Sequence, residues 1–192
     1  MDAATDPQGR PFALDVIRPW PEPARRAAHQ VILVHGPPDD LDERSLRWDH
    51  LGPWKRVVVC ADDGDQDRND VIESVIDVPV PADRRAELDE VAAEFRVTID
   101  DGGELAVCGP DLHANAITLN VVHAMVVDGL PPQEARERRS RDLAGLRDGH
   151  PPDDADELHF ADDRPHGEPR MVGMTGGGDD ASSMPLPGSS TA

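Results

Sequence analysis

The stretch GELAVCGPDLHANAITLNVVHAMVVDG, residues 103–129, decides how the chain is organised. It predicts a short buried strand over residues 104–107 and an apolar helix over residues 116–127, with a loop between them that begins at Cys108. Apolar residues lie nearly all round the predicted helix, so we expect it to be central and buried. Gly129 is of the type that ends a helix.

The loop between this strand and helix has the arrangement of an anion site. Free backbone N–H groups and the positive end of the helix dipole face such a loop. Asn115 is expected to be the N-cap of the helix. Cys108, at the head of the loop, has the position of a thiolate nucleophile. The alternative is that Cys108 is a small buried hydrophobic residue at a strand end.

The pattern resembles the dual-specificity class of cysteine-based protein phosphatases, whose loop reads His-Cys, five residues, Arg-Ser. Cys108 matches the nucleophile of that loop. The sequence departs from the family at the His, Arg and Ser places and at a mid-loop glycine, which are Val107, Ala114, Asn115 and Asp111 here. The resemblance implies a ligand-binding loop made of Gly109, Pro110, Asp111, Leu112, His113, Ala114 and Asn115.

These departures argue against phosphatase activity. The loop Arg of the family clamps phosphate through two charge-assisted hydrogen bonds, which the methyl group of Ala114 cannot replace. A carboxylate at Asp111, about 4 Å from a phosphate charge, would cost roughly 4 kcal/mol. We therefore expect a degenerate phosphatase-like domain that acts as a binding or regulatory module, without a cofactor. The alternative is an active cysteine-dependent phosphatase, a phosphoester hydrolase, with an atypical loop.

Two further residues enter through the same resemblance. Asp83 lies just past the Pro79–Pro81 segment, where the family places its general acid; the alternative is that it caps the following helix. Cys60 ends one predicted strand as Cys108 follows another, and some relatives pair their nucleophile with a second cysteine. Neighbouring strands would allow a Cys60–Cys108 disulfide, whereas strands separated by a third would leave two thiols that never meet.

The rest of the chain predicts an α/β fold with a central, mostly parallel sheet flanked by helices, as in dual-specificity phosphatases. Strands are predicted at residues 30–35, 56–61, 75–80 and 104–107. Helices are predicted at residues 41–51, 84–99, 116–127 and 132–146. The expected division is an irregular lead-in over residues 1–29, the phosphatase-like domain over residues 30–147, and a disordered acidic tail, rich in Pro, Gly and Ser, over residues 148–192.

Composition limits the classes of partner. The 192 residues include 39 acidic and 19 basic side chains, for a net charge of -20, so nucleic acid is not an expected partner. The charge fits either a surface adapted to high salt or compositional drift with an acidic tail. There is no apolar run of membrane-spanning length and no signal-peptide core, and two cysteines make no disulfide framework. We expect a cytoplasmic protein without a metal, whose partner is an unknown protein or a small anionic ligand.

Overall fold

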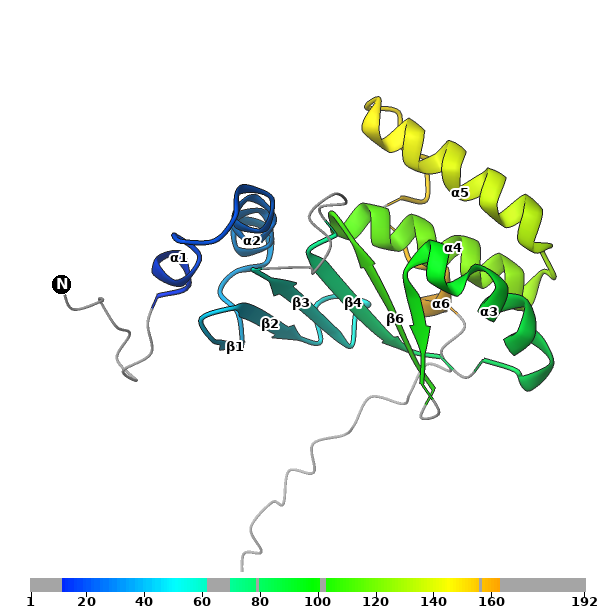
Figure 1. The fold of residues 1–192 in the computed structure, drawn as a ribbon, viewed down its shortest axis with the longest axis horizontal. Helices are drawn as coiled ribbons and strands as arrows, with labels where there is room; N and C mark the ends of the chain where they lie inside the picture. The colour runs from blue at the N-terminus through cyan, green and yellow to red at the C-terminus, as the bar shows by residue number, and fades with distance from the viewer. Residues whose placement is uncertain (1–11, 62–69, 79, 101–102, 156, 163–192) are drawn as a thin grey trace, which may run out of the picture.

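The computed structural model describes residues 12–61, 70–78, 80–100, 103–155 and 157–162. Within this part of the chain a six-stranded sheet has the order β1-β2-β3-β4-β6-β5 (Figure 1). The strands are β1 (Asp40–Leu41), β2 (Ser45–Asp49), β3 (Arg56–Cys60), β4 (Ile72–Asp77), β5 (Val97–Ile99) and β6 (Glu104–Gly109). The helices are α1 (Ala13–Val16), α2 (Glu22–His35), α3 (Ala82–Phe95), α4 (Leu112–Val127), α5 (Pro132–Arg147) and α6 (His159–Asp162).

Every pairing of neighbouring strands in this sheet is antiparallel, so the predicted mostly parallel, phosphatase-like sheet is wrong. This error in strand direction has a local cause, which is the additional strand β5. The sequence places residues 84–99 in one helix, whereas α3 ends at Phe95, Arg96 takes a left-handed conformation, and β5 follows. This additional strand turns the chain round before β6. The unit β4-α3-β5 therefore has parallel outer strands with β6 inserted between them.

The first large helix replaces a predicted strand. Residues 30–35 form the C-terminal half of α2, because the buried face of this helix is built on small residues at helical spacing, Ala24, Ala27, Ala28 and Val31. The apolar run that suggested a strand is largely solvent-facing. Leu33 is 86% exposed and Val34 is 66% exposed.

The predicted helix over residues 41–51 is also wrong, since this segment contains the end of β1 and all of β2. In β2 Leu46 and Trp48 are buried while Arg47 and Asp49 are exposed, which is the period of two that a half-buried strand requires. The indole N–H of Trp48 donates to the carbonyl of Gly36 at 3.1 Å, which ties the end of α2 to the sheet.

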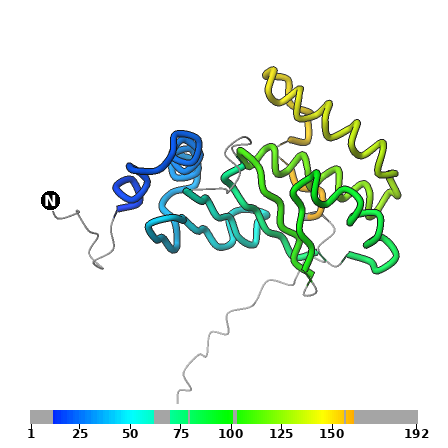
Figure 2. The backbone as a smooth tube through the Cα atoms, viewed as in Figure 1, coloured from blue at the N-terminus to red at the C-terminus, as the bar shows by residue number. Residues whose placement is uncertain are grey.

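One hydrophobic cluster joins the sheet to the helices. The inward side chains of the strands pack against α2 and α4, and α4 is buried along most of its length, as predicted. Figure 1 shows α4 against one face of the sheet, and Figure 2 shows α1 and α2 (blue) at one end of the molecule and α5 (yellow) at the other. The inward strand residues of this cluster are Leu46, Trp48, Val57, Val59, Ile72, Ile76, Leu105 and Val107.

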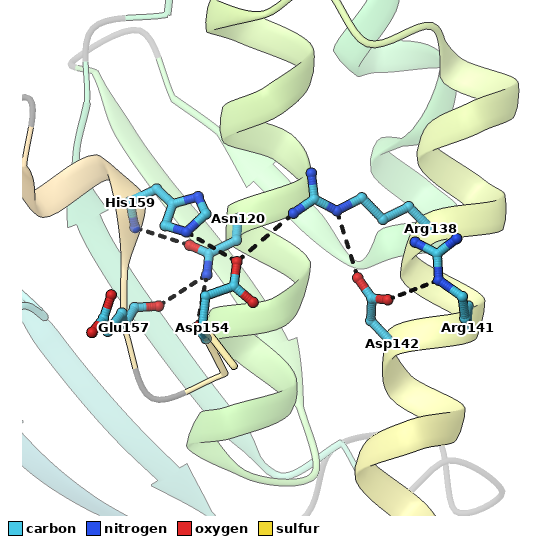
Figure 3. A network of polar contacts seen from close by, with 7 residues as sticks. All are labelled: Asn120, Arg138, Arg141, Asp142, Asp154, Glu157 and His159. Carbon is cyan, nitrogen blue, oxygen red and sulfur yellow. Dashed lines mark hydrogen bonds and ion pairs between the residues drawn. The ribbon is translucent and has the colours of Figure 1, made fainter. Parts of the chain in front are cut away.

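The start of the predicted disordered tail is packed on this core. Ala155, Leu158 and Phe160 are buried. The side chain of Asn120 in α4 bonds to the backbone of the neighbouring residues Asp154, Glu157 and His159 (Figure 3). The packed part of the chain is therefore longer than residues 30–147, since it also includes α2. The rest of the predicted tail, residues 163–192, and residues 1–11 of the predicted lead-in lie outside the described residues.

Among the described residues, no helix combines the length and the apolar character needed to cross a bilayer.

Candidate functional site

The structure places Cys108 on the face of the sheet opposite α4. Inward and outward side chains alternate along β6, so Val107 and Gly109 are buried while Cys108 points to the other face, half-buried, opposite Glu73 of β4. Burial, and then the Glu73 carboxylate, raises the pKa of the Cys108 thiol to about 11. This environment holds the thiol in its protonated form, which is the reverse of what a nucleophilic cysteine needs.

Cys60 and Cys108 share this outward face but are not neighbours. β3 and β6 run in the same direction, and both cysteines lie near the carboxyl ends of their strands, as expected. However, β4 lies between the two strands. Two strand spacings amount to about 9.6 Å, beyond the 4.4–6.8 Å between Cα atoms that a disulfide spans. Both thiols are free, and the sheet would have to rearrange to join them.

The predicted anion-binding loop is instead a tight turn into α4. The helix begins at Leu112, and Asp111 is its N-cap, with its carboxylate accepting the N–H of Ala114 at 2.8 Å. Asn115, the predicted cap, lies inside the helix and is 1% exposed. The carboxylate of Asp111 therefore occupies the helix N-terminus where a bound anion would sit.

Gly109 and Asn115 form a close contact between β6 and α4. The Asn115 side-chain amide donates to the Ile72 carbonyl at 3.0 Å and to Ser74 Oγ at 2.8 Å. Its oxygen, which has no hydrogen-bond partner among the described residues, lies where a Cβ atom at position 109 would be. These two members of the predicted loop thus have a packing role, and Ala114 is buried beside them.

Asp83 lies far from Cys108. It is an exposed residue in the first turn of α3, and Pro81 has the N-cap position. In the pairing of β4 with β6, Glu73 is opposite Cys108, while Asp77, which precedes α3, is opposite Glu104. About 13 Å of strand separates these two ends. The structure therefore does not bring the expected acid and the expected nucleophile together.

A pocket of about 300 Å³ does lie beside the first turn of α4. It is enclosed by α2, the turn between β2 and β3, the start of β4, and the segment that precedes α6. Its size is at the lower end of the range for small-molecule sites. Its apolar walls include Val31, Leu51, Trp54, Ile72, Leu112 and Leu158.

A few polar side chains are also in the pocket lining. Gln30 and His35 come from α2, Asp111 and His113 from α4, and Glu157 from the C-terminal segment. His113 Nδ1 lies 3.9 Å from Asp111 Oδ1. Within the part of the chain that the structure describes, no group of these or other residues could hold a metal ion.

The sequence therefore located only part of this site. Asp111, Leu112 and His113 of the predicted loop line the pocket, together with residues that were not singled out, such as Val31 and Trp54. The alanine spacing of α2 was the available signal for a helix there. Nothing in the spacing of the chain links α2 to residues 155–158, because their proximity is created by the fold.

No protein-family model, curated protein or solved structure significantly matches this chain. The resemblance to dual-specificity phosphatases stays a prediction from the motif around Cys108. Function is therefore inferred from the geometry of the pocket.

Proposed function

We propose that the chain is a non-catalytic binding module that holds a small, largely apolar molecule in the pocket between α2 and α4. The observation that carries this proposal is the pocket itself, with its volume of about 300 Å³, apolar walls and few polar side chains. This combination is typical of small-molecule sites in proteins.

The walls of the pocket belong to the hydrophobic core. Val31 is 3% exposed, and Trp54 and Ile72 are equally buried members of the same cluster. The hydrogen bond from Trp48 to Gly36 fixes the end of α2 beside them. A site with fixed walls loses little conformational entropy on binding, which favours affinity for a small ligand.

The environment of Cys108 supports a role without covalent catalysis. With a pKa of about 11, the thiol is almost entirely protonated at pH 7. The thiol also faces away from the pocket, and Asp111 caps the helix at the place where a substrate phosphate would bind. The groups of a cysteine phosphatase therefore do not converge on one substrate.

The proposal is tested by NMR titration of the labelled protein with benzyl alcohol and indole. We expect saturable shifts of the amide signals of Leu112, His113 and Trp54, which line the pocket. Ala116→Phe should abolish the shifts, because Ala116 lies in the pocket wall. Val34→Asp should weaken binding at least fivefold, whereas Leu33→Asp, a neighbouring exposed residue that does not line the pocket, should leave it unchanged.

Two results would overturn the proposal. One is the absence of saturable shifts with both probes, or shifts that survive in Ala116→Phe. The other is hydrolysis of an aryl phosphate that is lost in Cys108→Ser, which would restore the alternative of an active phosphatase. We expect the wild type and the Cys108→Ser variant to hydrolyse the aryl phosphate at the same background rate.

A further inference from the structure

We infer that the pocket selects molecules that carry a positive charge on an apolar body, with small primary amines as the ligand class. The inference rests on the proposed function and adds the charge of the ligand. Its basis is that Asp111 and Glu157 both line the pocket, while no Arg or Lys is among the described lining residues.

Asp111 is held in place by its role as helix cap. Its Oδ1 accepts the Ala114 N–H at 2.8 Å. A carboxylate can accept about four hydrogen bonds, so capping leaves capacity for an ammonium group. The side chain is 36% exposed, and a ligand in the pocket can therefore reach it.

Glu157 is held in place through its backbone. Its carbonyl accepts a hydrogen bond of 2.9 Å from the side chain of Asn120, and the amide of His159 donates to the same side chain at 3.0 Å. Figure 3 shows the Glu157 side chain pointing away from Asn120 and from the network around it. The fold thus fixes the backbone that carries a second carboxylate of the pocket lining, on a segment that follows α5.

With His35 and His113 counted as neutral, the formal charges on the pocket add up to a negative site. The N-terminus of α4 carries about +0.5 of a charge, which the full negative charge of Asp111 exceeds. Glu157 adds another negative charge. An anion of the same size would meet repulsion from both side chains, so this electrostatic balance disfavours the small anionic ligand expected from the phosphatase resemblance.

The test uses three ligands of nearly the same shape: benzylamine, benzyl alcohol and benzoate, titrated at pH 8 and 0.15 M salt. This salt concentration screens distant charges beyond about 8 Å. We expect benzylamine to bind about two- to fivefold more tightly than benzyl alcohol, the range for exposed ion pairs. Benzoate should bind more weakly than either.

Variants then assign the preference to the pocket. Asp111→Asn keeps a side chain that can cap α4, and together with Glu157→Gln it should bring the affinity for benzylamine down to that for benzyl alcohol. Because both side chains line the pocket, the readout is the ratio of the two affinities, which should fall to about one. Asp128→Asn, at the other end of α4, together with Glu134→Gln in the first turn of α5, makes the same change of two charges. This control should leave the preference for the amine intact, because neither residue lines the pocket.

The preference would be overturned if benzoate or benzyl alcohol bound as tightly as benzylamine. It would also be overturned if the double control, Asp128→Asn with Glu134→Gln, reduced the preference as much as the pocket variant, since the net charge of the chain would then explain it. Both results leave the proposed function standing, because the neutral ligand still binds. The failure of all three ligands to bind would overturn the proposed function as well.

Discussion

At the scale of single residues, the contact between Gly109 and Asn115 explains why the turn before α4 is so tight. Gly109 has no unusual backbone angle, so glycine is needed at this position because it has no side chain. The oxygen of Asn115 occupies that space, and the amide nitrogen of the same side chain bonds to Ser74 in β4. The polar side chain thus joins α4 to the sheet.

Replacing Gly109 by alanine should lower the free energy of unfolding by about 1–3 kcal/mol, the usual cost of overpacking a core. Urea denaturation measures this change. In an Asn115→Ala background the same substitution should cost much less, because the amide that the new methyl group would meet is gone. Equal losses in the two backgrounds would show that the contact with Asn115 is not the cause.

The thiol of Cys108 gives a prediction about pH. Its pKa of about 11 means that alkylation by iodoacetamide, which requires the thiolate, should be slow at pH 7.5 and should accelerate steadily as the pH rises from 9 to 11. Mass spectrometry of the labelled peptide measures the rate. A rate that levels off below pH 8 would mean that the thiol is ionised far more easily than its surroundings suggest.

A pair of variants tests the cause of this shift. Glu73→Gln removes a negative charge that raises the pKa of both Cys108 and Cys60, so both thiols should react faster at pH 8.5. Asp77→Asn removes a charge from the same face of the same strand, opposite Glu104. It should leave both rates almost unchanged, because Asp77 is not among the groups that shift either thiol.

At the scale of elements, helices and strands with a clear apolar pattern along their whole length could be predicted from the sequence. Very short elements, and those whose apolar residues are exposed, could not. The strands near residues 56–61 and 104–107 and the helices that became α4 and α5 were predicted correctly. The sequence failed at β5, whose three residues are too few to show a period, and at α2, whose exposed apolar residues imitate a strand. These errors set the wrong strand directions.

The candidate site was harder to predict for a different reason. Its lining comes from segments that are far apart in the chain, such as α2 and the residues Ala155, Glu157 and Leu158, and only the packing brings them together. The motif around Cys108 placed a site at the turn between β6 and α4, but it assigned the main role to Cys108, which lies on the other face of the sheet. Side chains alternate between the two faces along β6, so the face on which Cys108 lies follows from which face α4 covers.

Asn120, which is 2% exposed, makes three hydrogen bonds to the backbone of the segment after α5, beside the apolar contacts of Leu158 and Phe160. Asn120→Ala would leave the carbonyls of Asp154 and Glu157 and the amide of His159 without this partner. We expect a loss of about 1–3 kcal/mol in stability and faster hydrogen exchange of the His159 amide.

Thr118→Ala is the matched control, because Thr118 is an equally buried polar residue of α4 that bonds to the helix backbone and to Arg139. Exchange at His159 should be unaffected in this control. An Asn120→Ala variant with unchanged exchange at His159 would mean that the apolar contacts of Leu158 and Phe160 suffice to hold the segment.

At the scale of the whole molecule, the net charge of -20 opposes folding through self-repulsion. Ion pairs on the outward face offset part of it, as where Lys55 lies 2.7 Å from Asp77 and 2.6 Å from Glu104. Salt screens the repulsion of many exposed charges more than it weakens these few pairs. Calorimetry should therefore show a melting temperature that rises between 0.05 and 1 M sodium chloride, and a falling melting temperature would contradict this balance.

The positions of the tryptophans determine which part of the protein its intrinsic fluorescence reports on. The chain has three tryptophans and no tyrosine, and Trp20, Trp48 and Trp54 are all buried beside α2 and the first strands. Intrinsic emission therefore reports on that end of the molecule, whereas ellipticity at 222 nm comes mostly from the four long helices α2, α3, α4 and α5, of which only α2 lies at that end (Figure 1). Because one hydrophobic cluster runs through both ends, the two signals should change at the same denaturant concentration.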